Sequence, residues 1–201
     1  YRGVTKLANR RDEILEAAKK LFAQRSYHTV SLEDVSKYLQ MGKSTLYHYF
    51  STKEELFSEM VGENIATLQK YLEQRVDQKT GPEDKLQELV AALLEYFEEN
   101  RDFFLITVRE KMDFLKIKVQ RNGRNDTVRA SLDDSIKEFS SIITEGKKTG
   151  AFVQADSAVI FSSVIGTVTT VALDVIVYGR EAKLTDLTGD CWKVISGGIL
   201  A

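Results

Sequence analysis

The segment of residues 31–57, SLEDVSKYLQMGKSTLYHYFSTKEELF, constrains the fold of this chain most, because two short helical patterns follow each other across a tight turn. Ser31 stands three residues before Asp34, a capping-box spacing in which the side chains satisfy free amides at a helix start. Gly42 is a suitable N-cap for a second short helix over residues 43–49. Two short helices joined in this way predict a helix-turn-helix, which places its second helix in the major groove of DNA.

The predicted second helix has an apolar side and a polar side. Leu46 and Phe50 can turn inward toward a core. The polar side carries Lys43, Ser44, Thr45, Tyr47 and His48. These residues offer donors and a flat ring where a recognition helix meets base edges and phosphates. Thr52 and Glu55 then repeat the capping pattern and start a long helix with Lys53 in its first turn.

A dense set of residues between positions 9 and 57 resembles the N-terminal domain of TetR-type transcriptional repressors. The residues that carry the resemblance are Arg11, Ile14, Ala17, Ala18, Leu21, Phe22, Asp34, Val35, Thr45, Leu46, Tyr47, Phe50, Lys53, Glu55 and Leu56. The chain departs from the family pattern at Ser26 and Gln40, where Gly is usual, and at Gly42, where Ser is usual. Beyond this region the resemblance extends only to helical layout and length.

The resemblance implies an all-α fold. A three-helix DNA-binding domain would occupy residues 1–53, and a larger helical domain for ligand binding and dimerisation would occupy residues 54–201. It also implies a homodimer on a two-fold symmetric DNA operator. The expected DNA-contacting residues are Thr29, Ser31, Lys43, Ser44, Thr45, Tyr47, His48 and Lys53. Of these, Tyr47, His48, Thr29 and Lys53 would hold phosphates.

Charge is distributed unevenly along the chain. Residues 1–53 hold ten Lys or Arg against five Asp or Glu, whereas the remainder holds 18 against 25. A basic head, residues 1–53, on an acidic body, the remainder of the chain, suits a protein in which only the head contacts a polyanion. The plainer alternative is that residues such as Lys19 and Lys20 only solvate the outer face of the first helix. A lone cysteine, Cys191, and a basic, polar start without an apolar segment favour a cytoplasmic location without disulfides or a cleavable signal.

The helical period persists through the rest of the chain. Residues 14–22 carry the apolar stripe of an amphipathic helix. Further helices are expected over residues 52 to about 78, 82 to about 100, 102 to about 119, about 126 to 148, and about 185 to 199, with the loop RNGRND before the fourth of these. Pro82 and the acids after it fit the start of the second.

Residues 156–178 are almost continuously β-branched or aromatic, so a strand and a membrane span must be weighed against a helix. Six Ser or Thr residues and Asp174 argue against the membrane, while the length and a cap at Asp156 argue against the strand. A helix apolar on several faces is favoured, which needs burial on more than one side. This helix and the last one could form a four-helix bundle with the same helices of a second subunit. A thick single-chain core is the alternative.

Other motifs predict no chemistry. The tract MGKST is similar to the end of a phosphate-binding loop, but that loop's first glycine would fall at Lys37. His28 and His48 lack metal-ligand spacing, and the helical Glu residues have no nucleophile beside them. We therefore expect no catalytic residue, no metal site and no cofactor.

The expected effector is a small, mostly apolar molecule, because the resemblance implies a cavity among the body helices. Its candidate contacts are Phe97, Phe103, Phe104, Thr107, Phe114, Phe139, Ile143 and Phe161. Residues 109–129 carry seven Lys or Arg against three acids, so an anionic head group, as in a fatty acyl-CoA, is a hypothesis. Plain core packing and a solvated surface are the alternatives.

The sequence therefore predicts a repressor that leaves a palindromic operator when a small hydrophobic molecule binds. Two alternatives stay open. One is a DNA-binding regulator, repressor or activator, that is insensitive to small molecules. The other is a small-molecule-binding protein or enzyme with a vestigial DNA-binding head.

Overall fold

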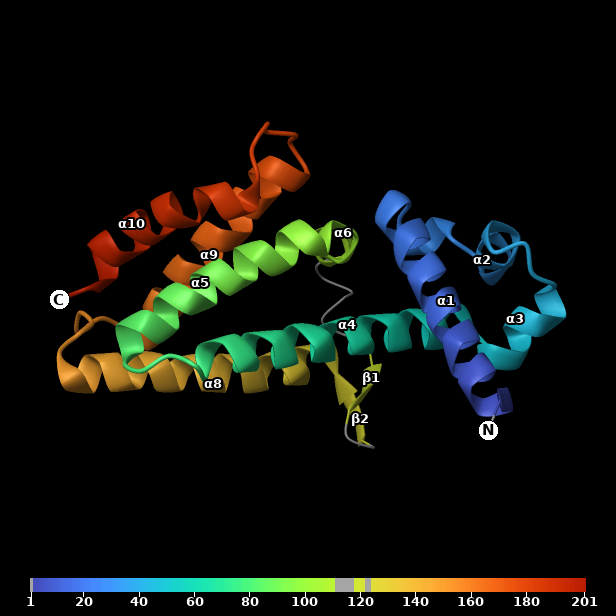
Figure 1. Ribbon diagram of the computed structural model, residues 1–201, viewed down its shortest axis with the longest axis horizontal. Helices are drawn as coiled ribbons and strands as arrows, with labels where there is room; N and C mark the ends of the chain where they lie inside the picture. Colours follow the sequence, from blue (N-terminus) through green and yellow to red (C-terminus); the bar gives the residue numbers. More distant parts are fainter. Residues whose placement is uncertain (1, 111–117, 122–123) are drawn as a thin grey trace. The chain divides into compact units, whose positions relative to one another are not determined.

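The computed structural model describes residues 2–110, 118–121 and 124–201, which are helical with one two-stranded hairpin (Figure 1). The chain divides into two compact units, Tyr1–Ala66 with Asp102–Ser131, and Thr67–Arg101 with Leu132–Ala201. The elements are α1 (Arg2–Gln24), η1 (Tyr27–Thr29), α2 (Leu32–Tyr38), α3 (Lys43–Tyr49), α4 (Lys53–Val76), α5 (Pro82–Glu99), α6 (Arg101–Arg109), β1 (Lys118–Arg121), β2 (Arg124–Thr127), α8 (Val128–Thr149), α9 (Ser157–Ile176), η2 (Leu184–Leu187) and α10 (Thr188–Ile199). The predicted all-α class is confirmed, while the domain boundary at residue 53 stays a prediction.

The first unit has its core between α1, α2, α3 and the start of α4. The apolar stripe predicted for the first helix is buried, as are apolar residues of the three helices that follow it. These buried residues are Ile14, Ala17, Ala18, Leu21, Phe22, Val35, Leu46, Phe50, Leu56 and Met60. Amphipathic periodicity thus located this core correctly.

The stretch after α6 differs from the sequence-based expectation. The helix expected from residue 102 to about 119 ends at Arg109, and its part over residues 111–117 lies outside the described residues. Lys118–Arg121 pairs antiparallel with Arg124–Thr127, with Lys118 opposite Thr127, so the expected loop RNGRND is largely strand. The signal was in the sequence, because an Asn-Gly pair between two short segments strongly favours a hairpin.

The second unit gathers α5, η2, α9 and α10 with most of α8 around an apolar core. Its buried side chains include Leu86, Val90, Leu94, Phe139, Ile143, Ile160, Val164, Val168, Leu184 and Ile195. α5 begins at Pro82 with Glu83 and Asp84 in its first turn, as predicted. The α10 helix begins at Thr188, preceded by η2, where the prediction had one helix from about residue 185.

α9 is a helix, so the strand alternative for this segment is wrong. The Asp156 carboxylate caps it by accepting the Ala158 amide at 2.7 Å. Within the described residues, α9 is the helix with the length and apolar composition to cross a membrane, a test that core helices of soluble proteins also pass. Only 28% of that window is buried, along a stripe through Ile160, Val164 and Val168.

The C-terminus is held by the connection between α8 and α9. Phe152, which is fully buried, forms a β-bridge with Leu200, and the Val153 amide donates to the Ile199 carbonyl at 2.9 Å. The Phe152 ring occupies the space where a Cβ on Gly146 would lie, 2.1 Å from its Cδ2 atom. Gly146 therefore allows the Phe152 ring to pack directly against α8.

Candidate nucleic-acid interface

The start of α2 is fixed by the predicted capping box. The Ser31 hydroxyl oxygen accepts the Asp34 amide at 3.2 Å, and the Ser31 amide donates to the Asp34 carboxylate at 2.9 Å. The Ser31 hydroxyl also donates to that carboxylate at 2.8 Å, and these bonds hold the pKa of Asp34 below its usual range. Ser31 thus has a structural role, in addition to the DNA contact that the sequence predicts for it.

The turn between α2 and α3 forms without the glycine that is usual in the family. Gln40 takes a positive φ of 51° there, a conformation that a residue with a Cβ adopts at some energetic cost. The Met41 amide donates to the Ser36 carbonyl at 2.9 Å, and Ser36 itself is buried. Gly42 then serves as the N-cap of α3 with an extended backbone, as predicted.

The two sides of α3 separate as the sequence predicts. Leu46 and the following Phe50 are fully buried, so they hold the helix against the core of the first unit. The five predicted DNA contacts on this helix, Lys43, Ser44, Thr45, Tyr47 and His48, are all exposed. Tyr47 exposes 48% of its surface, so it is not a core aromatic residue. α3 therefore presents a continuous polar face.

Arg11 of α1 braces the far end of α3. Its guanidinium forms a two-pronged ion pair with Glu59 of α4, donates to the Tyr49 carbonyl at 3.2 Å and lies 4.4 Å from the centre of the Phe50 ring. The hydrogen bond and ion pair with Glu59 raise the pKa of Arg11. A cation at a helix C-terminus also complements its dipole, so Arg11 fixes α3 at the end opposite its N-cap.

Lys53, expected to hold a phosphate, is the first residue of α4 and already has partners within the protein. Its amine donates to the Tyr27 carbonyl at 3.0 Å and lies 4.3 Å from the centre of the Tyr27 ring. The Tyr27 hydroxyl donates to Glu54 at 3.0 Å, and burial together with this acceptor raises the pKa of Tyr27 to about 12. Thr29, another predicted contact, is exposed in η1, where its hydroxyl donates to the Ser26 carbonyl.

Two residues that the sequence analysis did not identify form hydrogen bonds with the α1–η1 corner, the segment from the end of α1 to Tyr27. Arg109, the last residue of α6, donates to the Ala23 carbonyl at 2.9 Å and the Phe22 carbonyl at 3.4 Å, close to the end of α1. The Glu110 carboxylate accepts the Tyr27 amide at 2.9 Å. These contacts span more than 80 residues of sequence, so no local pattern could reveal them.

The predicted effector contacts are divided between the two units. Phe103, Phe104 and Thr107 lie on α6 in the first unit, and both phenylalanines are buried. The others that the structure describes, Phe97, Phe139, Ile143 and Phe161, lie in the second unit; Phe114 is outside the described residues. The rings of Phe139 and Phe161 meet edge to face with their centres 5.0 Å apart.

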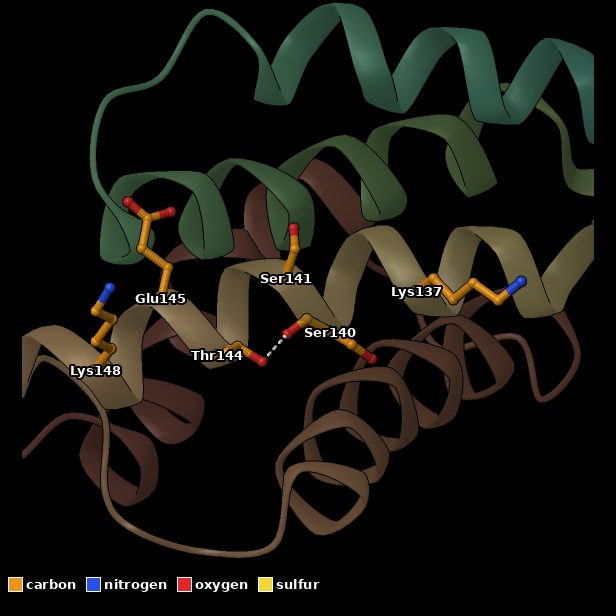
Figure 2. A pocket seen from close by; sticks show the side chains of 6 residues that line it. All are labelled: Lys137, Ser140, Ser141, Thr144, Glu145 and Lys148. Carbon is orange, nitrogen blue, oxygen red and sulfur yellow. Dashed lines mark hydrogen bonds between the residues drawn. The ribbon is translucent and has the colours of Figure 1, made fainter.

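An open groove of about 560 Å³ lies along α8 (Figure 2). Ser141 and Glu145 point to one side of the helix, and Ser140 and Thr144 point to another. The Glu145 carboxylate pairs with Lys85 of α5 at 3.6 Å, and the Thr144 hydroxyl donates to the Ser140 carbonyl at 2.7 Å. None of the predicted effector contacts that the structure describes lines this groove.

The sequence and the fold both match known regulators. Residues 14–60 match the family described as bacterial regulatory proteins, tetR family, and residues 79–173 match the tetracyclin repressor-like C-terminal domain. The uncharacterized HTH-type transcriptional regulator YhgD of Bacillus subtilis (strain 168) is 32% identical over 155 residues, which are 74% of each chain. This chain belongs to the TetR family.

Solved structures of TetR-fold regulators cover nearly the whole chain. The ketosteroid transcriptional regulator KstR2 of Mycobacterium tuberculosis has a TM-score of 0.80 at 22% identity, covering 96% of this chain and 95% of its own. The transcriptional regulator FadR of Bacillus subtilis, in complex with stearoyl-CoA, has a TM-score of 0.77 at 18% identity, and the match covers 92% of this chain and 97% of the FadR chain. These relatives are transcriptional regulators and not enzymes, and this TetR-family chain is a helix-turn-helix transcriptional regulator as well.

Proposed function

We propose that this protein is a cytoplasmic repressor that binds a palindromic operator as a homodimer and leaves it when a mostly apolar small molecule binds. The observation that carries the DNA-binding part is the polar, exposed face of α3, held at one end by Gly42 and at the other by Arg11. Residues 1–53 form the DNA-binding domain in this proposal, and two-fold symmetry places the two α3 helices in successive major-groove segments.

The proposed contacts divide by chemistry. Lys43, Ser44 and Thr45, at the N-terminal end of α3, reach base edges, where lysine and hydroxyl groups serve as donors. Tyr47 and His48, further along α3, contact phosphates. Thr29 before α2 and Lys53 at the start of α4 complete the phosphate contacts, and Ser31 before α2 is a further DNA contact. The Lys53 amine donates to the Tyr27 carbonyl, and in this proposal the same amine also contacts a phosphate.

We place the dimer interface on α9 and α10, because these helices expose large apolar side chains. Val159 is 58% exposed on α9, Tyr178 is 75% exposed just beyond it, and Val194 is 71% exposed on α10. The same two helices of a second copy would cover these residues in a symmetric four-helix bundle. A protein partner fits α9 better than lipid does, since its exposed surface also includes Ser162, Ser163 and other hydroxyl residues.

The proposed effector has an apolar chain and an anionic head, and a long-chain acyl-CoA has this chemistry. Support comes from the aromatic residues of α5, α6, α8 and α9 and from the excess of positive charge over residues 109–129. FadR of Bacillus subtilis, a fold neighbour, was solved with stearoyl-CoA. An apolar cavity between helices with a few polar groups at its mouth is a usual binding site for such a molecule.

In this proposal α6 transmits effector binding to the DNA-binding helices. This helix carries three of the candidate effector contacts, Phe103, Phe104 and Thr107, and ends at Arg109. Arg109 and Glu110 are bonded to the α1–η1 corner, so a shift of α6 on effector binding moves the DNA-binding helices. A small change in their spacing weakens a dimer that must match a groove repeat of about 34 Å.

A titration of the protein–operator complex with stearoyl-CoA tests the effector proposal. Fluorescence anisotropy of labelled operator should fall as stearoyl-CoA is added, whereas coenzyme A without an acyl chain should leave the complex intact. Free stearate, the third arm, shows whether the head group is required. Operator binding that no concentration of these ligands alters would favour the alternative of a regulator insensitive to such molecules.

A further inference from the structure

The helix-turn-helix carries no net formal charge, although it is the part that meets DNA. Residues 31–50 contain two lysines, Lys37 and Lys43, and two acids, Glu33 and Asp34. The positive charge of residues 1–53 therefore lies mainly outside the helices that read sequence. A neutral reading surface limits the sequence-independent attraction to phosphates, which grows with the number of cations that contact the backbone.

The two acids have different roles in the structure. The Asp34 carboxylate closes the capping box with Ser31, so it is engaged within α2. Glu33, in the same turn, extends across to the first residue of α3, where its carboxylate accepts a hydrogen bond from the Lys43 amine. This ion pair lowers the pKa of Glu33, so the carboxylate stays ionised at neutral pH.

The pair lies on the surface that DNA would occupy. The side chains of Lys43 and Glu33 are 57% and 44% exposed, and Lys43 is next to Ser44 and Thr45 on the polar face of α3. Exposed pairs of this kind contribute little to folding. Their electrostatic effect on a polyanion is larger, because a carboxylate beside the lysine cancels its attraction for phosphates and also repels them.

We propose that Glu33 is a specificity-determining residue that keeps Lys43 from acting as a general phosphate contact. Glu33 holds the flexible Lys43 side chain near the N-terminal end of α3. There the Lys43 amine donates a hydrogen bond to an acceptor on a base edge of the operator. On other sequences the lysine stays paired and adds nothing to binding. This inference rests on the proposed DNA-binding function and adds to it a residue that discriminates between operator and bulk DNA.

Glu33→Gln tests the proposal because it removes the charge and keeps nearly the same shape and helix propensity. Binding to operator and to scrambled DNA is measured by fluorescence anisotropy over a series of salt concentrations. We expect affinity for scrambled DNA to rise about 3- to 10-fold and its salt slope to steepen by about one, as for one added phosphate contact. Operator affinity should change less, so the ratio of the two affinities falls.

Two further variants make the result specific to this ion pair. Glu33→Gln combined with Lys43→Ala should lose the added salt slope, since the released cation is then absent. Glu16→Gln removes the same charge from a pair with Lys19 on α1, in which the nitrogen and oxygen are 2.6 Å apart and the Glu16 side chain is 60% exposed and the Lys19 side chain 15%. This variant should change neither affinity nor slope comparably.

Three outcomes would overturn the inference. The first is that Glu33→Gln gains affinity equally for operator and scrambled DNA. The second is that Glu16→Gln gains as much affinity for scrambled DNA as Glu33→Gln does. The third is that the steeper salt slope persists when Lys43→Ala is added to Glu33→Gln. A wild-type protein that shows no preference for operator would instead refute the proposed function from which the inference starts. Circular dichroism and the melting temperature confirm that each variant is folded, so that an unchanged affinity counts against the inference.

Discussion

Removing the Glu110 carboxylate should loosen the corner between α1 and η1. Glu110→Ala deletes the acceptor of the Tyr27 amide, a hydrogen bond of 2.9 Å between partly buried groups. Hydrogen bonds to charged groups contribute about 1.5–3 kcal/mol when buried. Because water can reach this amide once the carboxylate is gone, we expect a loss of about 1 kcal/mol in local stability.

That loss corresponds to about fivefold faster hydrogen exchange at the Tyr27 amide and a melting temperature lower by about 2–4 °C. Mass spectrometry or NMR of the exchanging protein measures the first quantity directly. Glu110→Gln keeps an acceptor oxygen and should fall between the wild type and the alanine variant. Glu99→Ala, which removes an exposed carboxylate from the end of α5, is the matched control.

Loss of this bond should also affect regulation. Since Glu110 and Arg109 are the proposed link from α6 to the DNA-binding helices, Glu110→Ala should retain operator binding but respond less to the effector. If exchange at Tyr27 is the same in Glu110→Ala and the wild type, the hydrogen bond does not hold this corner and the proposed route is wrong.

Three other substitutions have defined outcomes. Gly146→Ala should destabilise the protein by about 1–3 kcal/mol in urea unfolding, because the new Cβ would lie 2.1 Å from the buried Phe152 ring, and adding Phe152→Leu should recover part of the loss. Ser31→Ala should remove about 1 kcal/mol at neutral pH. The depressed pKa of Asp34 gives stability that is full above about pH 4 and is lost as the pH falls further. Urea unfolding across pH should therefore show that the free energy of unfolding decreases less at acidic pH in Ser31→Ala than in the wild type. Lys53→Ala should weaken all DNA sequences alike and reduce the salt slope by about one, and an unchanged slope in anisotropy titrations would exclude its phosphate role.

Local features of the fold could be predicted from the sequence because their causes are local. The Ser31 cap, the Gly42 cap and the start of α5 at Pro82 each depend on residues within one helical turn. The buried stripe of α1 and the helical state of α9 follow from periodicity, length and the Asp156 cap. The hairpin after residue 117 was missed because the segment around the Asn-Gly pair was interpreted as a loop between two helices, and the strand residues next to it were assigned to the ends of those helices.

The contacts that position the candidate interface could not be predicted in this way. Arg11 reaches Glu59 across 48 positions of sequence, and Glu110 reaches Tyr27 across 83. Such pairs depend on how helices pack, which one sequence does not reveal. The effector site was equally out of reach, because a buried phenylalanine such as Phe104 has the same sequence pattern whether it lines a cavity or fills a core.

Selective binding to an operator is the most direct test of the central proposal. Fluorescence anisotropy should compare the intergenic DNA beside the protein's own gene with a scrambled sequence, over a series of salt concentrations. We predict tight, salt-dependent binding that favours the intergenic DNA by at least about a thousandfold, with a stoichiometry of two chains per palindrome. Equal, weak binding to both DNAs at every salt concentration would contradict the proposal that the polar face of α3 reads an operator at this locus.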